Sequence, residues 1–233
     1  MLFRSDGDKA PIKAIANLCQ KHNAWLAVDD AHGLGIIGET GKGVVEYSGL
    51  TPEQLPIIIG TFGKAVGTSG AYIAASQLVI DYIKNFARHY IYSTAMSPIN
   101  AAATTAKLQQ MMQEQWRRET LQRNIVLFRR AAREIGLPVC DSETPIQPVI
   151  VGTPSAALSM ANALKQQGIW ALPIRTPTVP INTDRIRITL TALHTEQDIS
   201  DLINGLAHAK SVAENSIKST KSVKPKNKLD CKE

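Results

Sequence analysis

A lysine and an aspartate–histidine pair are the residues of this chain best placed to do chemistry, because each follows a short apolar run. Lys64 lies in Gly-Thr-Phe-Gly-Lys-Ala-Val-Gly, residues 60–67, directly after three isoleucines. Asp29 and His32 lie in Val-Asp-Asp-Ala-His-Gly, residues 28–33. Short apolar runs of this kind indicate buried strands. We therefore expect an amine, a carboxylate and an imidazole at strand ends.

These three groups, held in this way, suit an aldehyde cofactor, pyridoxal 5′-phosphate. The Lys64 amine can form a Schiff base with the aldehyde. Asp29 can pair with the pyridinium nitrogen, which keeps the ring positively charged and able to accept electrons. His32 can reach another edge of the same ring, and the Thr61 hydroxyl suits a phosphate oxygen.

Each of these residues also has a purely structural interpretation. Lys64 can be a loop lysine in a glycine-rich turn, and its glycine spacing differs from that of a phosphate-binding P-loop. Asp29 can cap the turn that follows its strand, with His32 on the surface. An Asp-x-x-His pair can also bind a metal ion, but no third ligand is evident, so zinc is not favoured.

The elements that must position these residues alternate between helix and strand, which indicates an α/β fold with a sheet covered on both faces. In such sheets ligands gather at the carboxyl ends of strands. In the first half we predict a helix over 10–22 and strands over 25–28, 56–59 and 71–75. In the second half we predict a helix over 99–135, strands over 148–151, 169–174 and 186–190, a helix over 156–167, and a helix that begins at the capping box 195–198.

Composition and charge limit the classes of function that the chain can have. The net charge of +6 comes mostly from residues 210–233, which carry seven lysines and three acidic residues. We predict that this basic tail is disordered, and that it binds neither nucleic acid nor membrane because it lacks interleaved aromatic residues and amphipathic spacing. No apolar run is long enough to cross a bilayer, and the first residues are too polar for a signal peptide. With three scattered cysteines, these features predict a cytoplasmic protein.

The segments 28–33 and 61–64 together resemble those of the fold-type I, pyridoxal-phosphate-dependent α-oxoamine synthases. The resemblance implies an incomplete large domain over 1–105 with a mixed, mostly parallel sheet, a smaller C-terminal α/β domain over 106–209, and a homodimer. It also implies the site roles. Asp29 pairs with the ring nitrogen, His32 contacts the 3′-oxygen of the ring, Thr61 binds near the phosphate, and Lys64 forms the Schiff base and abstracts the substrate's α-proton.

Three further segments, residues 86–94, 146–152 and 174–180, resemble one branch of that family. This branch condenses L-alanine with a pimeloyl thioester, releases carbon dioxide and makes 8-amino-7-oxononanoate for biotin synthesis. The resemblance implies that Arg175 holds the amino-acid carboxylate, for which a bidentate arginine is well suited, and that Thr178 lines the substrate site. Thr178 can equally stiffen a proline-rich turn, and Arg175 can form an ion pair.

The chain departs from the family pattern near its start. Arg4 stands where the family has a cofactor-contacting serine, and Ser5 could replace that serine only with a shift in register. The family's preceding portion, with a phosphate loop and a histidine that stacks on the cofactor ring, is not found in the sequence. We therefore expect a truncated synthase of impaired activity. The alternatives are a glycine C-acetyltransferase or 5-aminolevulinate synthase type of enzyme, or a non-catalytic degenerate fragment.

Overall fold

The computed structural model describes residues 6–222, so Arg4, Ser5 and the end of the basic tail lie outside the described residues. The chain divides into two compact units, Met1–Arg123 and Asn124–Glu233. The sequence placed this boundary after residue 105. The structure places the division later, and the segment after 105 lies against the first unit: a Cβ atom on Gly35 would come 2.7 Å from the Met111 sulfur, and one on Gly41 would come 3.0 Å from an Arg118 guanidinium nitrogen.

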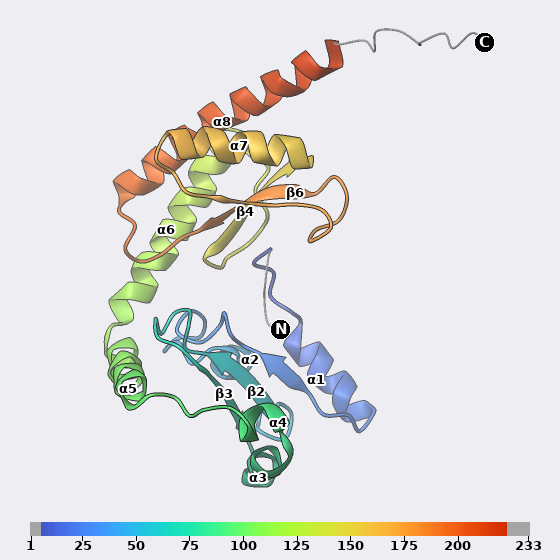
Figure 1. Cartoon of the computed structure of the whole chain (residues 1–233), viewed down its shortest axis with the longest axis vertical. Coiled ribbons are helices and arrows are strands. Elements are labelled where there is room, and N and C mark those ends of the chain that lie inside the picture. Colours follow the sequence, from blue (N-terminus) through green and yellow to red (C-terminus); the bar gives the residue numbers. More distant parts are fainter. Residues whose placement is uncertain (1–5, 223–233) are drawn as a thin grey trace, which may run out of the picture. The chain divides into compact units, whose positions relative to one another are not determined.

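The first unit contains a mixed three-stranded sheet in the order β1-β2-β3, with β1 at Ala27–Asp29, β2 at Ile57–Thr61 and β3 at Ala71–Ala75 (Figure 1). Strands β1 and β2 are parallel, whereas β2 and β3 are antiparallel. All three strands begin within about two residues of the positions that the apolar runs predicted. The predicted α/β architecture with a mixed sheet is therefore confirmed.

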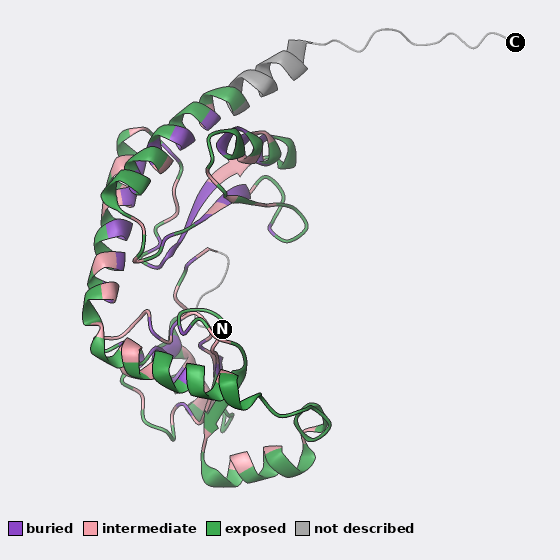
Figure 2. Cartoon of the chain, turned by 60° about the vertical axis from the view of Figure 1, so that its left-hand side comes forward, coloured by how far each residue is buried: buried purple, intermediate pink, exposed green. Residues whose placement is uncertain are grey.

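The helices of the first unit are α1 (Ile12–Lys21), α2 (Val44–Ser48), α3 (Gln77–Phe86), α4 (Arg88–Ile91) and α5 (Pro98–Gln113). Helix α1 was predicted and buries Ile12 and Ala16, four residues apart on one face. Helix α3 has no buried residue, and Figure 2 shows it as a mixture of exposed and intermediate residues. Its apolar side chains include Leu78, which is 82% exposed, and Phe86, which is 66% exposed.

The long helix predicted over 99–135 is two helices. Helix α5 ends at Gln113 and α6 (Gln115–Glu134) begins two residues later. Glu114 lies between them with a non-helical ψ of 62°, and its carboxylate accepts from the Gln110 amide and pairs with Arg117. A change of direction at one residue leaves the spacing of apolar residues on either side intact, so the periodicity did not reveal it.

The second unit contains an antiparallel sheet in the order β4-β6-β5, with β4 at Ile146–Gly152, β5 at Leu172–Ile174 and β6 at Asp184–Thr189. Helices α7 (Pro154–Gln166) and α8 (Glu196–Ser222) complete it, and both pack on each other. Side chains from the sheet and from α6, α7 and α8 form its core and are almost fully buried. They include Phe128, Ile146, Leu164, Ile186 and Leu206.

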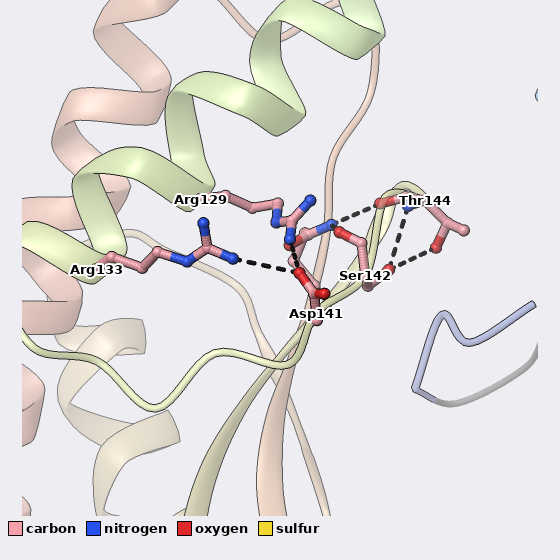
Figure 3. Close-up of polar contacts among 6 residues, drawn as sticks. Arg129, Arg133, Asp141, Ser142 and Thr144 are labelled. Carbon is pink, nitrogen blue, oxygen red and sulfur yellow. Dashed lines mark hydrogen bonds and ion pairs between the residues drawn. The ribbon is translucent and has the colours of Figure 1, made fainter.

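The turn before β4 is held to α6 by charged and polar contacts (Figure 3). Arg129 and Arg133, one helical turn apart on α6, both pair with Asp141. Beyond Asp141 the Ser142 hydroxyl lies 2.9 Å from that of Thr144. These contacts fix the connection between α6 and the edge strand β4.

The basic segment that begins at residue 210 is helical as far as Ser222, where the sequence had predicted disorder. Ala209 is fully buried, and the Lys210 ammonium donates to the Gly136 carbonyl over 3.0 Å. A lysine-rich composition suits an exposed helix as well as a solvated coil, which is why composition misassigned this part. Among the described residues, no helix has the length and apolar character needed to span a membrane.

Candidate active site

The parallel pairing of β1 and β2 brings the two chemical segments to one edge of the first sheet. Asp29, the last residue of β1, is in register with Ile59 of β2. Strand β2 ends two residues later at Thr61, and Lys64 follows in the next turn. Because parallel strands end at the same edge, the carboxylate and the amine-bearing loop both lie at this edge of the sheet.

The loop that carries Lys64 is closed by its own backbone. The Phe62 amide donates to the Gly70 carbonyl over 2.9 Å, and the Thr68 amide donates to the Phe62 carbonyl over 2.9 Å. Gly70 has a φ of +108°, a conformation that L side chains rarely adopt. The loop therefore holds the exposed Lys64 in a fixed turn beside the end of β2.

The Thr61 hydroxyl is engaged within this loop. It donates to the Gly70 carbonyl over 3.0 Å and accepts from the Gly63 amide over 3.2 Å. A phosphate oxygen at this place would take the donated hydrogen bond in exchange for the contact with Gly70. The structure thus places Thr61 at the expected edge of the sheet, with its proton directed into the loop.

Asp29 ends β1 and His32 lies in the turn that follows the strand, and both residues are half-buried. One carboxylate oxygen of Asp29 accepts from the Ala31 amide over 2.9 Å. The capping interpretation of Asp29 is therefore correct as far as this contact goes. A carboxylate has two oxygens with several acceptor positions, so the cap is compatible with a second, cationic partner.

Asp30 is a buried residue of this site that the sequence analysis did not single out. Its side chain is 1% exposed, and one oxygen accepts from the Val44 amide over 2.8 Å. Burial raises the pKa of Asp30 to about 6, the hydrogen bond from Val44 opposes this rise, and the charge of Asp29 adds to it. Two adjacent aspartates thus have different environments, with Asp29 at the sheet edge and Asp30 in the interior.

The two residues expected to bind substrate lie in the second unit. Arg175 and Thr178 are exposed in the loop between β5 and β6, and the Thr178 amide donates to the Arg175 carbonyl over 2.9 Å. The buried Asp184 of β6 holds this loop through the Thr176 amide, over 2.9 Å. Among the side chains of residues 6–212, Arg175 forms no ion pair, so the ion pair expected as its structural alternative is not found there.

The site can be compared with known proteins. The sequence profile of the family Aminotransferase class I and II matches residues 5–206. The chain belongs to this family. Among aminotransferase class I and II members, it is 48% identical to an 8-amino-7-oxononanoate synthase of Cellvibrio japonicus over 205 residues, and 47% identical to one of Saccharophagus degradans over 206.

Each of these matches covers 88% of this chain but 52% of the relative, so the chain spans about half the length of the curated relatives it matches. Solved structures give the same picture of the aminotransferase fold. A structure titled as SPT with a PLP internal aldimine superposes with a TM-score of 0.86 at 27% identity, covering 91% of this chain and 54% of the other. An 8-amino-7-oxononanoate synthase from Francisella tularensis has a TM-score of 0.77 at 23% identity, covers 94% of this chain and 62% of the other, and supports the fold alone.

Proposed function

We propose that this chain carries part of the active site of an 8-amino-7-oxononanoate synthase. The reaction is the decarboxylative condensation of L-alanine with a pimeloyl thioester in biotin biosynthesis, performed by a cytoplasmic homodimer. The observation that carries this proposal is the parallel register of β1 and β2, which gives one sheet edge both Asp29 and the loop of Lys64. Identity of 48% to relatives of that name supports the choice of reaction.

The residues at this edge fit pyridoxal 5′-phosphate. Lys64 brings an amine that can react with its aldehyde, and Asp29 brings a half-buried carboxylate, which favours a cationic partner such as its ring nitrogen. When bound, the cofactor supplies an electron-accepting ring for the carbanion that forms at the amino-acid α-carbon. The solved structure of SPT with a PLP internal aldimine shares the fold over 91% of this chain.

The positions of the chain's own residues support a role for each of them. Lys64 would hold the cofactor through its aldehyde, and its Nζ atom would take the α-proton of the substrate. Asp29 would hold a proton on the ring nitrogen, His32 would contact the 3′-oxygen, and Thr61 would bind near the phosphate.

The second unit provides the proposed substrate contacts. Arg175 pairs with the substrate carboxylate, since its exposed guanidinium has no ion-pair partner among the described residues. Thr178 lines the substrate site from the same loop. Both roles are supported by the fixed backbone of this loop, in which the Thr178 amide contacts the Arg175 carbonyl.

The test is to trap the cofactor on the chain. The purified chain is incubated with pyridoxal 5′-phosphate, reduced with borohydride and mapped by peptide mass spectrometry. We expect the adduct on Lys64, and its loss in Lys64→Ala. Lys42→Ala is the matched control, because Lys42 is also an exposed loop lysine of the first unit. Labelling spread over surface lysines, or unchanged after Lys64→Ala, would refute the proposal.

A sister α-oxoamine synthase is the second candidate, because structures titled serine palmitoyltransferase superpose on this chain with a TM-score of 0.86. The amino acid that perturbs the absorbance of the bound cofactor separates the two. We expect L-alanine to produce the change at lower concentration than glycine or L-serine. The reverse order would favour the sister enzyme.

A further inference from the structure

We infer that Asp30 is a positioning residue of the cofactor site, which ties the end of β1 to the start of α2 and so fixes the segment 31–43 that carries His32. What Asp30 positions depends on the proposed function. The tie itself is a property of the first unit and can be measured without cofactor.

The side chain of Asp30 connects the end of β1 to the start of α2. Its Oδ2 atom accepts from the Val44 amide over 2.8 Å, fourteen residues along the chain. Val44 is the first residue of α2, and the residue before it, Gly43, provides no side-chain cap. The Asp30 carboxylate therefore performs the capping role for this helix from the end of a strand, and it closes the intervening segment into a loop.

The backbone of Asp30 connects the end of β1 to β2 and to the turn that contains His32. Its amide donates to the Ile59 carbonyl of β2 over 2.7 Å, and its carbonyl accepts from the Gly33 amide over 3.0 Å. The first contact anchors Asp30 to the strand that leads to Lys64. The second closes the turn that contains His32. Asp30 thus follows β1 directly in the chain and is hydrogen-bonded to β2. It is also hydrogen-bonded to Gly33 near the start of the segment 31–43 and to Val44 just after its end.

Two glycines lie against the Asp30 carboxylate, where any larger residue would collide with it. A Cβ atom on Gly33 would lie 1.9 Å from Oδ1 of Asp30, and one on Gly43 would lie 2.0 Å from Oδ2. Gly43 also has a φ of +72°, which disfavours any other residue. The beginning and the end of the segment therefore close around the same side chain.

The contacts of Asp30 hold the segment 31–43 in position, but the burial of its carboxylate lowers the stability of the first unit. Its Oδ1 atom is buried and has no hydrogen-bond partner in the part of the chain whose side chains are described, residues 6–212. A buried polar atom without a partner destabilises the fold, and burial also raises the pKa of the group. A neutral or apolar residue would avoid this cost. What it would lose is the charge-assisted bond to the Val44 amide.

Amide hydrogen exchange of the cofactor-free chain tests the tie. We expect Asp30→Ala to speed exchange in residues 31–44 at least ten-fold and to leave residues 62–70 unchanged, with Asp30→Asn in between because its amide oxygen can still accept. Asp198→Ala is the matched control, since Asp198 accepts from the Thr195 amide at the start of α8 in the other unit. Unchanged exchange in 31–44, or an equal rise throughout the first unit, would overturn the inference. If Asp30→Ala does not fold, the same comparison for Asp30→Asn decides.

Cofactor binding supplies the second measurement. We expect Asp30→Asn to shift the pH midpoint of the absorbance of the Lys64-bound cofactor, and Asp198→Ala to leave it in place. An unshifted midpoint in Asp30→Asn would show that Asp30 does not position the site. If the wild-type chain traps no cofactor, the proposed function fails, and hydrogen exchange alone then decides whether Asp30 fixes the segment.

Discussion

Adjacent aspartates at the end of β1 show how position separates identical side chains. Asp29 is half-buried at the sheet edge and accepts one local hydrogen bond, whereas Asp30 is fully buried and accepts one from a helix fourteen residues away. The sequence identified Asp29 from the apolar run before it and could not identify Asp30. The partner of Asp30, the Val44 amide, is a backbone group, and no residue type reveals such a contact.

The raised pKa of Asp30 makes the stability of the first unit depend on pH. Its pKa is about 6 in the folded chain against 3.8 for the ordinary group, because burial and the charge of Asp29 disfavour the ionised form. The stabilising contribution is therefore fully present below pH 3.8 and is lost as the pH rises through 6. The difference corresponds to about 3 kcal/mol in the free energy of unfolding.

Asp30→Asn removes this titration. We therefore expect the free energy of unfolding of Asp30→Asn, relative to that of the wild type, to become larger as the pH is raised from 4 to 7.5. Urea unfolding monitored by circular dichroism at the two pH values measures the difference. Asp198→Asn is the control, because hydrogen bonds from Thr195 hold the pKa of Asp198 below its usual value and its dependence has the opposite sign. A difference between Asp30→Asn and wild type that does not change with pH would contradict the account.

At the scale of elements, apolar runs and caps located most of the structure correctly. The strands at 27–29, 57–61 and 71–75 followed from unbroken runs of apolar residues. The capping box was right as well, since the Thr195 hydroxyl accepts from the Asp198 amide over 3.1 Å. Helix α2 was missed because its five residues are too short for a periodic pattern. The break at Glu114 was missed because both sides of it are helical.

The packing of α7 on the second sheet gives a prediction at this scale. Leu164 is fully buried, whereas Leu158 on the same helix is 39% exposed. Leu164→Ala is expected to lower the free energy of unfolding of the second unit by about 2–5 kcal/mol, and Leu158→Ala by less than about 1 kcal/mol. Urea unfolding of both variants checks this. An equal decrease in the free energy of unfolding for the two variants would show that Leu164 is not part of the core of the second unit.

At the scale of the whole molecule, the chain is two units with separate cores, and the proposed residues are distributed between them. Asp29, His32, Thr61 and Lys64 belong to the first unit, and Arg175 and Thr178 to the second. The sequence predicted two α/β layers from the order of elements. The division between the two units falls within α6, at a place that no change in composition marks.

The exposed apolar face of α3 bears on the proposed homodimer. Apolar residues so exposed mark interaction surfaces, and Leu78 and Phe86 lie on this helix. Leu78→Ser with Phe86→Ser is expected to weaken self-association at least ten-fold in sedimentation equilibrium, without lowering the stability of the fold. Ile181→Ser is the control, because Ile181 is 76% exposed in the other unit. Unchanged association would exclude α3 from the interface.

The nitrogen-15 shift of the cofactor ring tests most directly whether Lys64 and Asp29 bind one molecule of pyridoxal 5′-phosphate. With cofactor labelled at the ring nitrogen, the account predicts a protonated nitrogen at neutral pH in the wild-type chain and a neutral one in Asp29→Ala. Borohydride should trap the cofactor on Lys64 in both. A neutral ring nitrogen in the wild type, or a shift unaffected by Asp29→Ala, would contradict it.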